Sequence, residues 1–191
     1  MLGVDDEMTT RFTSDFHLSH ARIIEYSERP FRNIDEMNRE LVARYNAVVQ
    51  DDDVVYNVGD LSMKESIVPI VVPLLKGIKY LISGNHDRTF AGRKNHEEAI
   101  KRYIGYGFKD VMMETRVERF LVNHLPYMKD DDTGHEARFP EWRPKNDGGY
   151  LICGHVHKAW LRKDKMINVG VDVHEYKPIS LEALIAMTEL H

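Results

Sequence analysis

Short apolar runs alternate with helix-like spacing through the first half of the chain. Three runs rich in β-branched and aromatic residues predict strands, at Arg11–Ser14, Asp53–Val58 and Lys79–Ser83. Between them, apolar side chains recur at every third or fourth position, which predicts helices at about residues 34–48, 64–76 and 95–103. The first of these helices follows Asn33 and carries Glu36, a pair that resembles a capping box. Strands that alternate with helices predict a largely parallel sheet covered by helices.

The second half changes to shorter strands joined by tight turns. Val111–Glu114 and Arg119–Asn123 predict a pair of strands. Three further short strands are predicted, with a hairpin tip at Lys163–Lys165 between the last two: Tyr150–Cys153, Ala159–Arg162 and Met166–Val169. A helix that begins near Ser180 closes the chain. The fold class predicted from both halves is α/β, with two packed mixed sheets flanked by helices.

Residues 125–149 interrupt this pattern with prolines, glycines and the acidic run Asp130–Asp132. A loop of this length within a small domain is usually either functional or disordered. Two interpretations therefore stay open: a surface insertion without a role, or a lid that faces the substrate.

Length and charge narrow the class of protein. The 191 residues fit one domain spanning 1–191, and 42% apolar residues suffice for a sizeable core. The net charge is −5, whereas a protein that binds long nucleic acid usually has a basic face, so this class of protein is disfavoured. No segment has the length or the apolar character of a membrane span.

The N-terminus and the cysteine content predict a location. Residues 1–8 are acidic without an apolar core, so we expect a flexible lead-in rather than a signal peptide, with translation starting at Met1 or Met8. The single cysteine, Cys153, lies in an apolar run and is expected in the core. A chain without a possible internal disulfide suits the cytoplasm.

The candidate chemistry lies where the predicted strands end. Five segments carry ligand-type residues directly after an apolar run: Ser14–His17, Gly59–Asp60, Gly84–Asp87, Asn123–His124 and Gly154–His157. Because ligands of open α/β sheets bind beyond the carboxyl ends of the strands, these segments are expected to converge on one site.

The donor types indicate metal chemistry. Oxygen and imidazole donors suit manganese, which we favour, or iron, zinc, nickel or magnesium. The candidate ligands exceed what one four-coordinate ion needs, so two divalent ions sharing a carboxylate are expected: Asp15, His17, Asp60, Asn85, His124, His155 and His157. Two such ions about 3.5–4 Å apart can clamp a phosphate and activate a bridging water for in-line attack.

Taken together, these segments resemble the signature of the calcineurin-like metallophosphoesterase superfamily, which reads D-x-H, G-D, G-N-H-[DE], a lone H, and G-H-x-H. The resemblance covers about residues 11–172, and the further run Arg29–Phe31 is similar to small phage and bacterial members. It implies a four-layer αββα sandwich.

The resemblance also implies roles for individual residues. One metal ion would be held by Asp15, His17 and His157, and the other by Asn85, His124 and His155. Asp60 would bridge both ions. His86 would act as the general acid or stabilise the phosphoryl oxygens, and Asp87 would orient it.

For other polar residues near these segments the sequence leaves alternative roles open. His20 can bind substrate or support the ligands, and Arg88 can contact phosphate or form a surface ion pair. Asn168 and Asp172 can support the ligands from behind. The run Asp51–Asp53 is interpreted as a solvated turn.

The expected activity is hydrolysis of a small phosphodiester, such as a 2′,3′- or 3′,5′-cyclic nucleotide, by attack of a metal-bridging hydroxide. The alternatives are a phosphomonoesterase or a nucleotide pyrophosphatase.

A Ser/Thr protein phosphatase is disfavoured, because Leu61–Lys64 replaces the Asp-Arg-Gly of that branch. A nuclease is disfavoured by the acidic balance, and a non-catalytic scaffold by the complete ligand set. The sequence leaves the oligomeric state open between a monomer and a small homo-oligomer.

Overall fold

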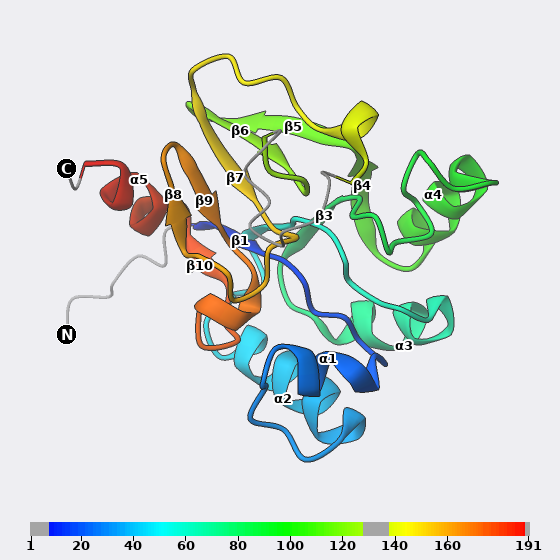
Figure 1. The fold of residues 1–191 in the computed structure, drawn as a ribbon. Helices are drawn as coiled ribbons and strands as arrows, with labels where there is room; N and C mark the ends of the chain where they lie inside the picture. Colours follow the sequence, from blue (N-terminus) through cyan, green and yellow to red (C-terminus); the bar gives the residue numbers. More distant parts are fainter. Residues whose placement is uncertain (1–7, 128–137, 190–191) are drawn as a thin grey trace.

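The first sheet follows the predicted βαβα order. The computed structural model describes residues 8–127 and 138–189. The sheet has the order β10-β1-β2-β3-β4, in which β1 to β4 are parallel and β10 is antiparallel to β1 (Figure 1). Its strands are β1 (Thr10–Thr13), β2 (Val54–Asn57), β3 (Ile78–Ile82), β4 (Phe108–Met112) and β10 (Ile179–Ser180).

Helices cover one face of this sheet. They are α1 (Ala21–Tyr26), α2 (Ile34–Asn46), α3 (Val68–Val71) and α4 (His96–Gly105). Apolar residues of α2, such as Met37 and Leu41, share a buried cluster with the sheet residues Val55 and Leu81. The predicted start of α2 is confirmed, because Asn33 Oδ1 accepts the main-chain N–H of Glu36 at 2.9 Å.

The predicted helix over residues 64–76 is wrong in its length. The segment forms three short pieces instead: η1 (Glu65–Ile67), α3 and η2 (Val72–Leu74). Pro69 and Pro73 explain the interruption, because proline lacks an N–H and is tolerated only at the start of a helical turn.

The second sheet has the order β5-β6-β7-β9-β8, with β6, β7 and β9 parallel and the two edge strands antiparallel. Its strands are β5 (Glu114–Val117), β6 (Phe120–Asn123), β7 (Tyr150–Cys153), β8 (Arg162–Lys163) and β9 (Met166–Asn168). The predicted pairing of Val111–Glu114 with Arg119–Asn123 is wrong, because the chain changes sheets at Met113: β4 joins the first sheet and β5 pairs with β6. Of the strand predicted at Ala159–Arg162, only Arg162 lies in a strand, as the first residue of β8.

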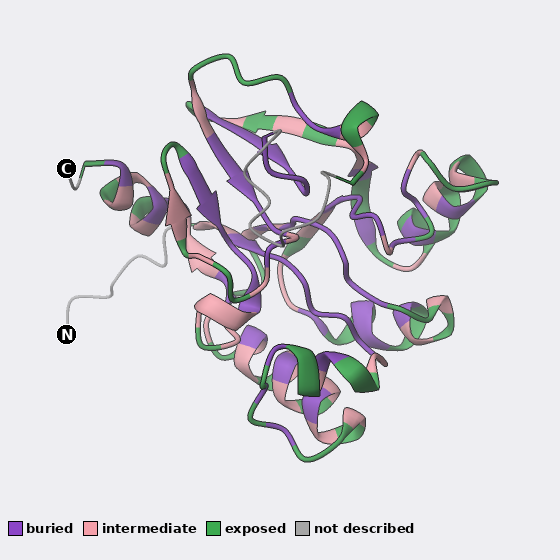
Figure 2. Ribbon diagram, viewed as in Figure 1, coloured by how far each residue is buried: buried purple, intermediate pink, exposed green. Residues whose placement is uncertain are grey.

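The two sheets pack face to face. Phe12, Ile82, Val122 and Ile152 lie in the apolar layer between them, and the central strands β6, β7 and β9 of the second sheet are mostly buried (Figure 2). The last helix, α5 (Leu181–Glu189), contributes Leu181 and Leu184 to the same layer.

The outer face of the second sheet differs from the implied four-layer sandwich. Leu151 and Cys153 on this face pack with Tyr127 and Trp160. Among the described residues this face is covered by residues from loops rather than by a helix. The structure thus has an α/β fold with two mixed sheets, and a fourth layer is not observed in the part of the chain that the structure describes.

Asp53 is buried, so its interpretation as part of a solvated turn is wrong. Its carboxylate accepts hydrogen bonds from Arg11 Nε at 2.8 Å, from the Thr9 N–H at 2.8 Å and from the Gln50 N–H at 3.0 Å. Burial opposes ionisation, but these donors outweigh it and hold the pKa of Asp53 below its usual value. The carboxylate therefore ties the start of β1 to the start of β2.

No helix in the described residues is long and apolar enough to span a membrane.

Replacing Asp53 should destabilise the protein in a pH-dependent way. We expect Asp53→Asn to lower the free energy of unfolding by about 1–3 kcal/mol at pH 7, because three donors lose a charged acceptor. A depressed carboxyl pKa stabilises the fold above the unfolded pKa of about 3.9, so this difference should shrink as the pH falls below about 4. Urea unfolding between pH 7 and pH 3.5 measures both effects. The exposed neighbour provides the control, since Asp52→Asn should change stability by less than about 0.5 kcal/mol, and an equal loss in both variants would contradict the role of Asp53.

Candidate metal centre

The loops after β1, β2 and β3 of the first sheet meet the loops after β6 and β7 of the second. The Asp15 N–H donates to Gly59 O at 3.0 Å, and the Gly154 N–H donates to His124 O at 3.1 Å. The His155 N–H donates to both carboxylate oxygens of Asp15, at 3.0 and 3.2 Å. The fold thus brings the five segments together at one site, as predicted, although they come from the edges of two sheets.

The donor atoms at this edge form two groups. Within each group the ligand atoms lie within 4.8 Å of one another: Asp15, His17 and His157 in one, Asp60, His124 and His155 in the other. Asp60 lies between the groups, with its Oδ2 3.5 Å from His17 Nε2 and 3.4 Å from His124 Nε2. Asn85 Oδ1 joins the second group at 3.2 Å from His124 Nε2. This grouping is the one that the family resemblance implies.

The residues fit divalent cations. His17 is buried, and neither of its ring nitrogens has a hydrogen-bond partner among the described residues. A buried unpartnered nitrogen is costly unless another group takes its lone pair. Two carboxylates, an amide oxygen and four imidazoles form a donor set suited to Mn, Fe, Ni or Zn.

Hydrogen bonds behind the ligands orient two of the histidines. His124 Nδ1 lies 2.7 Å from Val58 O, so Nδ1 carries the proton and Nε2 faces the centre. His157 Nδ1 lies 3.3 Å from Asp172 Oδ2 in the same way. The predicted supporting role of Asn168 is also visible, because its Nδ2 donates to His157 O at 2.7 Å.

Arg29 anchors this supporting layer. Its guanidinium binds Asp172 through Nε and Nη2 at 2.8 and 2.9 Å. It also donates to Asp15 O at 2.7 Å and to Phe16 O at 2.8 Å. One buried fork thus fixes both the backbone that carries Asp15 and the carboxylate behind His157.

Five of the seven candidate ligands have left-handed backbone conformations, with φ between 50° and 72°: Asp15, His17, Asp60, His155 and His157. For residues other than glycine this region is disfavoured, by about 1 kcal/mol or more each. Strained conformations of this kind persist where the surrounding structure holds them, and they are concentrated at functional sites.

Glycines before the ligands allow the loops to approach closely. A Cβ on Gly84 would lie 2.2 Å from Asp60 Oδ1, and one on Gly154 would lie 2.0 Å from Ser14 Oγ. A Cβ on Gly59 would lie 2.5 Å from His124 Nδ1, and its φ of +93° also favours glycine. Glycine at these positions is therefore a steric requirement of the centre.

The charges of the two aspartates dominate the centre. Although burial opposes it, the charge of Asp60 raises the pKa of His124 to about 9. Burial lowers the pKa of His155 to about 4. The neighbouring histidines hold the pKa of Asp60 well below its usual value in spite of burial. Two ionised carboxylates in one buried site attract positive charge.

Asp87 does not orient His86 as predicted. Its fully buried carboxylate accepts the main-chain N–H groups of Asp60 and Gly84 at 2.9 Å and of Leu61 at 3.0 Å. Burial and the charge of Asp60 raise the pKa of Asp87 to about 7, against the lowering effect of these amides. Asp87 is therefore a positioning residue that holds the loop of Asp60 against the loop of Asn85.

His86 lies at the open side of the centre. Its side chain is 39% exposed, and its Nε2 lies 4.0 Å from Asp60 Oδ2. Its main-chain N–H donates to Asp60 Oδ1 at 2.8 Å, which fixes the loop. The ring thus faces a space where a substrate can enter.

The two residues predicted to bind substrate are placed differently. His20 lies beside His17, with ring centroids 5.5 Å apart and a buried unpartnered Nδ1, but it does not line the cavity. Burial lowers its pKa to about 4, so it is neutral at pH 7. Arg88 is exposed and does not line the cavity.

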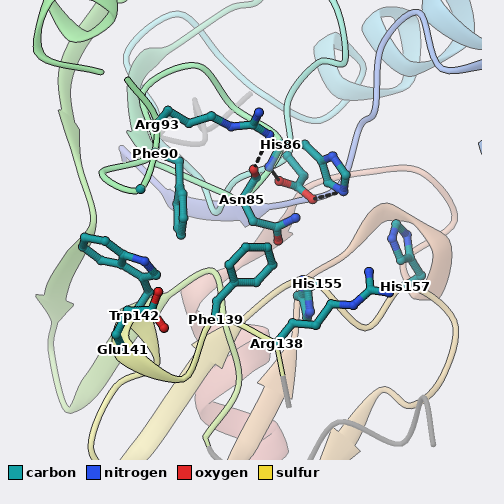
Figure 3. Close-up of a pocket in the computed structure, with 12 residues that line it drawn as sticks. Asn85, His86, Phe90, Arg93, Arg138, Phe139, Glu141, Trp142, His155 and His157 are labelled. Atoms are coloured by element: carbon teal, nitrogen blue, oxygen red, sulfur yellow. Dashed lines mark hydrogen bonds and ion pairs between the residues drawn. The ribbon is translucent and has the colours of Figure 1, made fainter. Parts of the chain in front are cut away.

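A cavity of about 800 Å³ opens in front of the ligands. Figure 3 shows His155 and His157 on one side of it and Phe90 and Trp142 on the other, with Phe139 between them. Residues 125–149, for which a lid was one of two interpretations, are described in part, since 128–137 lie outside the described residues. Arg138, Phe139, Glu141 and Trp142 of this segment do line the cavity, the last two in η3 (Pro140–Trp142).

Several of these residues were not identified from the sequence. Arg93 lines the cavity and donates from Nη2 to Asn85 O at 2.7 Å. Phe139 and Trp142 could have been identified, since two aromatic residues within four positions are unusual in a loop rich in proline and charged residues. The contact between Arg29 and Asp172 could not be predicted from neighbouring residues, because the two are 143 positions apart.

Comparison with known proteins places the chain in a family. It is 33% identical over 186 residues to the uncharacterized protein MJ1445 of Methanocaldococcus jannaschii, covering 92% of this chain and 89% of that protein. The chain belongs to the family of MJ1445. It is also similar to the Gene 66 protein of Mycobacterium phage L5, at 29% identity over 85% of this chain and 86% of that protein. No protein-family model matches the chain.

The fold of this family is also found in a solved structure. The crystal structure of AQ665 from Aquifex aeolicus, a protein of unknown function, matches with a TM-score of 0.69 and 23% identity. The match covers 95% of this chain and 100% of that chain. At this identity the likeness concerns the fold alone.

Removing the Asp87 carboxylate should affect stability as well as the centre. We expect Asp87→Ala to lower the free energy of unfolding by about 3 kcal/mol or more, because three buried N–H groups lose their acceptor. The variant should also bind Mn²⁺ more weakly, because the loop of Asp60 loses its support. Chemical unfolding and calorimetric Mn²⁺ titration measure the two effects. His86→Ala is the matched control and should leave the free energy of unfolding nearly unchanged; equal stability of both variants would contradict the positioning role of Asp87.

Proposed function

We propose that this protein is a metal-dependent phosphoesterase that hydrolyses small phosphodiesters. The observation that carries the proposal is the position of Asp60 between two groups of donor atoms, with His86 at the open side facing a cavity. Two cations sharing one carboxylate are suited to phosphoryl chemistry. The resemblance of the five segments to calcineurin-like metallophosphoesterases supports the same activity.

In this proposal Asp15, His17 and His157 would hold one cation, and Asn85, His124 and His155 would hold the other. Asp60 would serve both sites. When bound, the cations supply positive charge to the phosphate and lower the pKa of water. Manganese is favoured, and the same donors suit iron, zinc or nickel.

Other residues of the chain deliver a proton, attract the substrate and position the ligand loops. His86 presents Nε2 to the cavity, where it can deliver a proton to the oxygen of the leaving group. Arg93 and Arg138 at the cavity add positive charge that attracts an anionic substrate. Arg29 and Asp87 hold the ligand loops in position.

Phosphomonoesterase or nucleotide pyrophosphatase activity is the second candidate, because the same donor set serves these reactions as well. A diester is favoured because the cavity is open and much larger than one phosphate group. The net charge of −5 disfavours long nucleic acid as the substrate. The single buried cysteine suits a reducing compartment, so we propose a cytoplasmic location.

Activity should depend on the metal and on Asp60. Protein treated with a chelator should not cleave bis-p-nitrophenyl phosphate, and added Mn²⁺ should restore cleavage. Asp60→Asn should lower kcat/KM by at least about 100-fold, the scale for losing one charge-stabilising group. The exposed Asp35→Asn is the control and should retain activity.

The same assay separates the candidate activities. A higher kcat/KM for the diester than for p-nitrophenyl phosphate supports the phosphodiesterase, and the reverse order supports the monoesterase. If metal-loaded protein leaves both compounds and a panel of 2′,3′- and 3′,5′-cyclic nucleotides intact, the proposed function is wrong.

The role of His86 can be tested through the leaving group. If His86 protonates the leaving oxygen, His86→Ala should slow substrates with alkoxide leaving groups by about 100-fold or more. Substrates with p-nitrophenolate leaving groups need no protonation and should be affected far less. Equal losses for both substrate types would instead indicate that His86 binds the substrate.

A further inference from the structure

The cavity in front of the candidate metal centre has two chemically different ends. One end carries the metal-ligand residues and His86. The other carries three aromatic residues: Phe90, Phe139 and Trp142. A volume of about 800 Å³ lies within the range of cavities that hold whole small molecules and is far more than a phosphate fills.

The aromatic end is a packed unit. The centroid of Phe90 lies 5.7 Å from that of Phe139 and 5.5 Å from that of Trp142, with edge-on geometry in both pairs. Phe90 is buried, while Phe139 and Trp142 are half-buried. A Cβ on Gly92 would lie 2.9 Å from the Phe90 ring and 3.3 Å from Trp142 Nε1, so the turn at Gly92 is closely packed against these rings. Phe90 thus supports two rings whose free surfaces face the cavity.

The surroundings of these rings suit a planar group with polar edges. Arg93, Arg138 and Glu141 line the same cavity, which makes its rim charged rather than apolar. An alkyl chain would gain little from such a rim. A heteroaromatic ring can stack on aromatic side chains while its edges contact charged groups.

We propose that the organic part of the substrate is a nucleoside whose base stacks on Phe139 and Trp142 while its phosphate lies at the metal centre. Figure 3 shows Phe139 lying between Trp142 and the two histidines, and both ends border the same cavity. This inference rests on the proposed function, because it uses the metal centre as the place of the phosphate. It adds the place of the base, which is the aromatic end of the cavity at Phe139 and Trp142.

Binding of two matched phosphonates tests the inference without depending on catalysis. The phosphonate analogues of adenosine 5′-monophosphate and of ribose 5-phosphate differ only in the base, and their P–C bonds are not hydrolysed. Calorimetric titration of the Mn²⁺-loaded protein gives both Kd values. We expect the nucleotide analogue to bind about 5- to 100-fold more tightly, the range for stacking of one base on aromatic side chains.

Variants of the aromatic residues identify the source of this preference. Phe139→Leu and Trp142→Leu should each lower the ratio of the two Kd values by at least about threefold, whereas Phe139→Tyr retains the ring and should keep the ratio. Two separate positions keep the test decisive if one variant fails to fold. The inference is wrong if the wild-type ratio is near one, or if both leucine variants keep the wild-type ratio.

The outcome is distinguishable from a failure of the proposed function. Base-dependent binding without hydrolysis of any phosphoester would reject the phosphoesterase and retain the nucleotide site. Metal-dependent hydrolysis with a Kd ratio near one would retain the phosphoesterase and reject the nucleotide site.

Discussion

The carboxylate of Asp15 joins the two sheets. It follows β1 of the first sheet and accepts the N–H of His155, which follows β7 of the second. The contact is possible because Gly154 leaves room for Ser14 and Asp15, where any side chain would collide with them. If this contact opened, each group of donor atoms would be divided, since each group draws residues from both sheets. The centre therefore depends on how closely two sheet edges approach, more than on any single ligand.

The supporting layer turns this approach into a fixed geometry. Arg29 holds the carbonyl oxygens of Asp15 and Phe16 and the carboxylate of Asp172, and Asp172 in turn holds His157. Asp87 does the same for the loops of Asp60 and Asn85. These bonds offset the cost of left-handed backbone at the ligands. The repulsion between two buried carboxylates remains, and divalent cations would relieve it.

The sequence predicted the parts of the structure that follow local rules. Strand-end placement identified every residue of the two donor groups, because the carboxyl ends of parallel strands share one edge. The start of α2 was predicted because Asn33 caps it through a contact three residues away. The change of sheet between β4 and β5 was not predicted, since consecutive apolar runs carry no information about which partner each strand chooses.

The errors at the site also arise because contacts between loops depend on the fold and not on nearness in sequence. Asp87 was assigned to its neighbour His86, but a buried carboxylate contacts whichever N–H groups the folded loops bring to it. Arg88 was considered because it directly follows Asp87, whereas the arginine that contacts the Asn85 loop is Arg93, which was not considered. Arg29 and Asp172 are 143 positions apart, beyond any pattern read along the chain.

That separation has a consequence for how the protein is made. Asp15 and His155 are 140 positions apart, and the clamp from Arg29 spans slightly more. Contacts of such long range form late, because loop closure must be completed before they contribute. On a ribosome, a nascent chain that has reached β4 can build most of the first sheet but neither donor group. The two donor groups are thus complete only when nearly the whole polypeptide has emerged.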